Sequence, residues 1–155
     1  MSQLLEQTLR NFTHTRLDRP PKQLPKFPHL LGGDIDLWRN FLFANPKFFD
    51  AVSYDVRVGE GMALQGDWSL EIADMAKTLS QRRIDVAAER EGAIWLIELK
   101  MDPSVSLIGQ LEAYFILFSA ELEQKVDIKL CAIVNRLTPD LITVLDYKKI
   151  RYFVI

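Results

Sequence analysis

Residues 83–114, RIDVAAEREGAIWLIELKMDPSVSLIGQLEAY, carry most of the information about the fold of this chain. It holds two runs rich in apolar and β-branched residues, 83–88 and 93–100, on either side of the dipeptide Glu91-Gly92. This pattern is typical of two antiparallel strands joined by a tight turn. Residues 106–122 then form a long apolar segment that predicts a buried helix, with Ser104 or Ser106 as its N-cap.

The rest of the sequence predicts further elements around this hairpin and helix. Apolar periodicity predicts a short helix within 3–13, helices at 35–44, 68–79 and 139–145, and strands at 53–58, 128–134 and 151–155. Asp34 directly precedes helix 35–44 and is expected to be its N-cap. Elements in this order predict an α/β (α+β) domain with a mixed central β-sheet flanked by helices.

Length and composition are those of one ordinary globular domain. The chain has 155 residues, of which 48% are hydrophobic and 26% are charged. Its single cysteine, Cys131, excludes an internal disulfide and lies in an apolar run, so a buried thiol is expected. No apolar run is long enough to span a bilayer, and the amino terminus lacks a signal-peptide pattern, so we expect a cytoplasmic protein without membrane contact.

The first 33 residues differ in charge from the rest of the chain. They hold five Lys or Arg against two acidic residues, a net charge of +3, whereas the whole chain carries −2, which leaves −5 on residues 34–155. Four prolines between positions 20 and 28 exclude a helix or a central strand there. The chain is therefore divided into a basic, proline-rich N-terminal arm, 1–33, and a domain, 34–155. Either contact with nucleic acid or a solvated tail is compatible with such an arm.

Asp85, Glu98 and Lys100 are the candidate catalytic residues. Two carboxylates and a lysine at the ends of adjacent strands form a site for a hard divalent cation and a water molecule that it activates. Gln110 and Tyr114 lie one turn apart on the following helix and point the same way.

Strand geometry predicts how these side chains converge. Alternate residues of a strand share a face, so Glu98 and Lys100 are expected to project together. By the same rule Asp85 shares its face with Arg83 and Ala87. The opposite face of that strand is expected to carry Ile84, Val86 and Ala88.

These residues resemble the signature of a known family. Ile84-Asp85 and Glu98-Leu99-Lys100, with twelve residues between the two carboxylates, are similar to the motif of the PD-(D/E)xK nuclease superfamily. The sequence GQLEAY, 109–114, resembles the QxxxY motif of its RecB-type exonuclease branch. Isoleucine replaces the proline that precedes the aspartate in the family motif. The resemblance extends over 35–135 in the order of elements and over 83–114 in the motifs, and it implies a restriction-endonuclease-like core.

The resemblance also implies roles for individual residues. Asp85 and Glu98 would hold Mg²⁺ (or Mn²⁺) through their carboxylates, with the Leu99 carbonyl as an extra ligand. Lys100 would orient or help deprotonate the attacking water. Gln110 and Tyr114 would position the nucleic-acid backbone and close the site.

The acid that many members of the superfamily supply from their first helix is not identified by the motif. The candidates are Asp36, Glu60 and Glu71.

The function implied is that of a metal-dependent DNA nuclease, a phosphodiester hydrolase acting in repair, recombination, phage or mobile-element processing, or defence. One alternative is a catalytically weak protein of the same fold that binds DNA or serves in assembly. A second is an interaction protein with no nucleic-acid role. Other classes lack their motifs, because Gly32-Gly33 and Gly59-x-Gly61 match neither a phosphate loop nor a dinucleotide fingerprint, and one cysteine with two distant histidines does not make a zinc site.

The helix predicted at 106–122 has almost no polar face, so both of its sides must be covered. One candidate cover is the N-terminal arm, whose apolar residues are Phe12, Leu17, Leu24 and Phe27. The other is a second subunit, which would make the protein a homodimer through helix 106–122.

Overall fold

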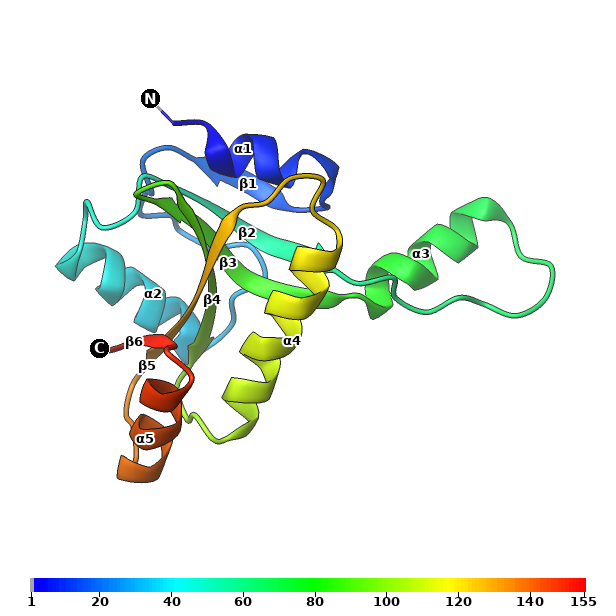
Figure 1. Cartoon of the computed structure of the whole chain (residues 1–155). Coiled ribbons are helices and arrows are strands. Elements are labelled where there is room, and N and C mark those ends of the chain that lie inside the picture. Colours follow the sequence, from blue (N-terminus) through cyan, green and yellow to red (C-terminus); the bar gives the residue numbers. More distant parts are fainter. Residues whose placement is uncertain (1) are drawn as a thin grey trace.

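The computed structural model describes residues 2–155 and contains one six-stranded sheet (Figure 1). The elements are α1 (Leu4–Thr8), the 3₁₀ turn η1 (Leu9–Asn11), β1 (Thr15–Asp18), α2 (Gly33–Ala44), β2 (Ala51–Val58), α3 (Leu70–Ser80), β3 (Arg82–Arg90), β4 (Ala93–Lys100), α4 (Ser106–Ala120), β5 (Asp127–Val134), α5 (Pro139–Tyr147) and β6 (Arg151–Val154). Each predicted helix and strand is present, with its ends shifted by a few residues.

The strands follow one another across the sheet in sequence order. β1 to β4 form an antiparallel meander, and β5 and β6 then join in parallel to β4 and to each other. α4 and α5 make the two crossovers that parallel neighbours require. The hairpin predicted at Glu91-Gly92 is confirmed, since both residues have positive φ (50° and 75°), as a tight primed turn needs. The sheet is therefore mixed and flanked by helices, as predicted.

Helices cover both faces of the sheet (Figure 1). On one face α1, α4 and α5 share an apolar cluster with Ile94 and Leu96 of β4. On the other face α2 packs in a second cluster with Ile97 and Leu99 of the same strand. Because successive residues of β4 point into the two cores in turn, nearly the whole strand is buried.

The prediction for the faces of the strand at 83–88 is wrong at one point. Ile84 packs in the α4-side cluster, whereas Val86 packs in the α2-side cluster. The paired strand β2 switches at the same level, between Tyr54 and Val56. The residue between them, Asp55, adopts φ 53°, a left-handed conformation that aspartate tolerates better than most residues. Both strands therefore turn over beside Asp85, which means that the alternation of their side chains between the two faces of the sheet is interrupted there.

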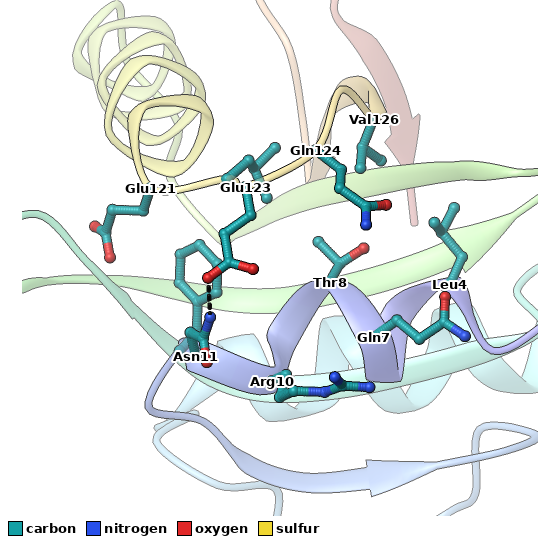
Figure 2. A pocket seen from close by; sticks show the side chains of 11 residues that line it. Leu4, Gln7, Thr8, Arg10, Asn11, Glu121, Glu123, Gln124 and Val126 are labelled. Atoms are coloured by element: carbon teal, nitrogen blue, oxygen red, sulfur yellow. Dashed lines mark hydrogen bonds between the residues drawn. The ribbon is translucent and has the colours of Figure 1, made fainter.

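The N-terminal arm is divided between the two cores. Leu5 and Leu9 are fully buried, and the ring of Phe12 stacks on that of Phe118 in α4 at a centroid distance of 4.6 Å. Figure 2 shows α1 and the loop after α4 facing each other. Between them is a pocket of about 180 Å³, across which Asn11 Nδ2 donates a hydrogen bond to Glu123 Oε1 at 2.8 Å. Leu24 and Phe27 pack on the α2 side instead. The first half of the arm thus covers part of α4, and the second half belongs to the other core.

A buried ion pair fixes the arm to the sheet. Glu89 is fully buried, and its Oε2 accepts hydrogen bonds from the Leu5 amide (2.9 Å) and from Arg19 (3.0 Å). Burial raises the pKa of this carboxyl, but the hydrogen bonds and the Arg19 charge together bring the pKa below its usual value. A charged group that is buried with its partners in this way holds the arm in one position.

One element stands apart from the layers. α3 projects away from the sheet at the end of a long loop (Figure 1), and none of its residues is buried. Within residues 2–155, no helix combines the length and the apolar character that a membrane crossing requires.

Candidate functional site

The end of the β3–β4 ladder brings the two predicted carboxylates together. Strand pairing ends at Val86 and Ile97, so Asp85 lies opposite Glu98 one position further on. Beyond this point the Leu99 amide donates its hydrogen bond to Oδ2 of the Asp85 side chain, at 2.9 Å, instead of to a backbone carbonyl of β3. The bond fixes the carboxylate beside β4.

Glu98 points to the α4 side of the sheet. The residue is only 5% exposed, and its Oε2 accepts a hydrogen bond from the hydroxyl of Tyr114 in α4 at 3.0 Å. Burial and the Glu98 charge raise the pKa of the Tyr114 hydroxyl, so this group remains a donor at physiological pH. The structure thus brings together Asp85, Glu98 and Tyr114 from three elements.

The two carboxyl groups repel each other. Burial, first, and then the Asp85 charge raise the pKa of Glu98 to about 8. Burial and the charge of Asp34 raise the pKa of Asp85 to about 6. Hydrogen bonds to the carboxylates and the nearby Lys100 charge oppose these shifts without cancelling them. Near neutral pH the pair therefore tends to retain a proton, which is the behaviour of two acids that share one site.

Lys100 lies at the end of β4 and is half-buried. Its charge lowers the pKa of all three acids around it, Asp85, Glu98 and Asp34. Gln110 is half-buried one turn before Tyr114 on α4, and the hydrogen bonds that hold the two carboxylates do not involve it. Leu99 contributes its amide group, while its side chain packs in the α2-side core.

The third acid of the site is Asp34, and the prediction that this residue is an N-cap is wrong. The cap position of α2 is Gly32, and Asp34 lies in the first helical turn. Burial raises the pKa of its carboxyl group, whereas Lys100 and a backbone hydrogen bond from Met101 lower it. The close approach depends on Gly33, since a Cβ at that position would collide with the Met101 side chain.

The three acids considered from the sequence lie elsewhere. Asp36 is exposed and lies 3.9 Å from Arg39. Glu60 is on the loop after β2, and Glu71 is on the projecting helix α3. The missed signal was the pair Gly32-Gly33, which allows the amino terminus of α2 to approach the end of β4.

An ion pair next to the site was also missed. Asp55, 8% exposed, accepts hydrogen bonds from two guanidinium nitrogens of Arg83, Nε at 2.6 Å and Nη2 at 2.8 Å. The Arg57 guanidinium lies 3.7 Å from the same carboxylate. Arg83 is thus held by Asp55 while its charge reaches Asp85. This pair braces the start of β3 where the strand turns over.

The donor set suits a hard divalent cation with a partly aqueous shell. Hydrogen bonds from the protein engage one oxygen of Asp85 and one of Glu98, and two acids with raised pKa values favour a nearby positive charge. Within the described residues, no group of three or more His, Cys, Asp or Glu side chains is arranged to hold a metal ion. Mg²⁺ does not need such a group, because it commonly binds through one or two carboxylates and several waters.

Comparisons with protein-family models, with curated proteins and with solved structures find no match to this chain. The function of this protein must therefore be inferred from the residues of the site itself.

Proposed function

We propose that this protein is a metal-dependent nuclease that hydrolyses phosphodiester bonds in DNA, with Mg²⁺ (or Mn²⁺) held by Asp85 and Glu98. The observation that carries the proposal is the convergence of the buried Glu98, the half-buried Asp85 and one lysine at the end of β4, with the pKa of both carboxyl groups raised. The resemblance of Asp85, Glu98-Leu99-Lys100 and the Gln110–Tyr114 helix to the PD-(D/E)xK superfamily supports it independently.

Each residue of the site would have a separate role in the reaction. Asp85 and Glu98 would bind the ion, with the Leu99 carbonyl as a further ligand, and the bound ion would supply a polarised phosphoryl group and a more acidic water. Lys100 would orient this water and stabilise the charge that develops on the phosphate. Tyr114 keeps Glu98 in one orientation through its hydrogen bond. Asp34 adds negative charge near Lys100 and the carboxylate pair.

The raised pKa values also favour a second candidate function. Because protons compete with a cation for Asp85 and Glu98 near neutral pH, the apparent affinity for the ion is lowered there. A protein with this fold and a weak metal site would act as a DNA-binding or assembly module rather than as an enzyme.

Cleavage assays separate the two candidates. The purified protein is incubated with Mg²⁺ or Mn²⁺ and linear, circular, single-stranded or branched DNA, and the products are resolved on gels. We expect cleavage by the wild type and a loss of about 100-fold or more in Lys100→Ala, since the lysine acts on the developing charge. Lys125→Ala, which removes an exposed loop lysine, is the matched control and is expected to remain active.

Binding measurements complete this test. Mg²⁺ is expected to raise the melting temperature of the wild type and of Lys100→Ala, but much less that of Asp85→Ala. DNA binding without cleavage under all these conditions would select the binding module. Lys100→Ala as active as the wild type would remove the catalytic role of the motif.

A further inference from the structure

Helix α3 carries an apolar stripe that nothing in the described chain covers. Ile72, Met75 and Leu79 recur at the spacing of one helical face, and Leu79 is 69% exposed. Trp68, just before the N-cap Ser69, is 55% exposed. A helix of 11 residues without a packed face is marginal in water, so such a stripe indicates a binding surface.

The stripe has acidic residues along one side. Glu71 and Asp74 precede Ile72 and Met75 by one residue each, and Asp67 lies just before the helix. Against these three acids the segment holds one base, Lys77. None of the ion pairs among residues 2–155 involves any of the three acids.

A cleft elsewhere on the molecule is concave and apolar and has a basic rim. β6 pairs only with the second half of β5, from Cys131 onward, and leaves the first half as an open edge beside the outer face of α4. There a cleft of about 860 Å³ is lined by apolar side chains, of which Ile116 is 64% exposed. The apolar lining residues include Trp95, Phe115, Ile116, Ile128, Leu130 and Ile150.

The rim of this cleft is basic. Five basic residues lie there against the acids Glu91 and Glu112, namely Arg90, Lys129, Lys148, Lys149 and Arg151. Arg90 and Lys148 pair with the two acids, at 3.0 Å and 2.7 Å. Among the described ion pairs, none involves Lys129, Lys149 or Arg151.

We infer that this cleft binds helix α3 of a second copy of the chain, and that two copies exchange their α3 helices reciprocally. The apolar stripe of α3 lies on the apolar floor, and the acids beside it face the three unpaired basic residues of the rim. The exchange also covers the outer side of α4, which the N-terminal arm leaves open at Phe115 and Ile116. Pairing of α3 with α3 is less favourable because it brings two acidic segments together. Two-fold exchange closes the assembly at a dimer.

Two variants, each at an exposed residue, test the two sides of the contact separately. Met75→Asp places a charge on the stripe of α3, and Ile116→Asp places one on the floor of the cleft. Phe43→Asp is the matched control, since Phe43 is 85% exposed on α2 and is not among the residues that line the cleft. By light scattering on a sizing column we expect dimers for the wild type and the control, and monomers for Met75→Asp and Ile116→Asp.

Mixing the two variants identifies the geometry. Met75→Asp retains an intact cleft and Ile116→Asp retains an intact α3, so an equimolar mixture is expected to form a 1:1 pair through one remaining contact. The wild-type dimer should also dissociate more readily as salt rises from about 0.05 to about 0.3 M, because opposite charges face each other.

Several outcomes would overturn the inference. A wild type that is monomeric at all concentrations excludes self-association through these surfaces. A dimer that survives Ile116→Asp but not Met75→Asp shows pairing of α3 with α3. Oligomers that grow with concentration exclude the closed reciprocal exchange.

Discussion

The β3–β4 hairpin and helix α3 are neighbours in sequence but opposites in environment. In β4 the chain buries apolar residues on both faces and also buries the charged residue Glu98. In α3 the chain exposes apolar residues such as Leu70, 84% exposed, beside charged ones. A buried carboxylate is costly, and so is an exposed apolar stripe. Under the two proposals made above, a bound cation would offset the first cost and a protein surface on α3 would offset the second.

The packed part of the molecule explains how it tolerates the site. The carboxylates lie at the end of the strand that is buried in both cores, where helices α2 and α4 hold the backbone from either side. The ion pair of Asp55 with Arg83 braces the same end of the sheet. Rigid surroundings of this kind keep two repelling acids close together.

Replacing a leucine by alanine in each of the two regions is expected to give the largest difference in the free energy of unfolding. Leu96→Ala, at a fully buried position of β4, is expected to lower the free energy of unfolding by about 2–5 kcal/mol, because it leaves a cavity. Leu79→Ala, on the exposed face of α3, is expected to change it by less than about 0.5 kcal/mol. Denaturant unfolding at low protein concentration measures both. Comparable losses in the two variants would mean that α3 packs within its own chain.

A change of pH is expected to alter the stability of the protein through Glu98. The folded-state pKa of Glu98, about 8, lies above its ordinary value of 4.5, so the folded state retains a proton that the unfolded state releases. The contribution of this group to stability is full below about pH 4.5 and is lost as pH rises through about 8.

Glu98→Gln keeps an acceptor for Tyr114 but does not titrate. In metal-free buffer we expect this variant to be more stable than the wild type by about 2 kcal/mol at about pH 8.5, with no such gain at about pH 5. Unfolding curves at the two pH values test this expectation, with Asp127→Asn, an exposed residue of β5, as the control. A gain that is equal at both pH values would show that charge is not its cause.

Removing the N-cap side chains of α3 and α5 is expected to have the smallest effect on stability. Ser69 and Thr138 each accept a hydrogen bond at 3.3 Å from the amide three residues ahead, at the starts of α3 and α5. Thr138→Ala is expected to lower global stability by about 1 kcal/mol, since α5 buries Leu141 and Leu145 in the core.

Ser69→Ala is expected to leave global unfolding nearly unchanged and to speed amide exchange within α3 alone. Hydrogen exchange combined with denaturant unfolding distinguishes the two responses. Equal global losses for the two caps would place α3 inside the cooperative unit.

The sequence pattern predicted the mixed sheet, the hairpin at Glu91-Gly92 and every helix and strand except β1, for which it gives no signal. These features depend on periodicity and on turn residues, which are local properties of the chain. Local periodicity also predicts which face of the strand carries Glu98 and which face of the helix carries Tyr114. In the structure a hydrogen bond joins these two side chains.

The identity of the third acid, the place where β3 turns over and the exposure of α3 depend on the tertiary structure. Asp34 approaches Lys100 because Gly33 lets α2 come close to Met101, a contact between distant segments that periodicity does not encode. Ile84 and Val86 point to different cores because β2 and β3 turn over together beside Asp55 and Asp85. The apolar residues of α3 satisfy a helical pattern equally well when buried or exposed, so only the arrangement of the other elements shows that they remain uncovered within residues 2–155.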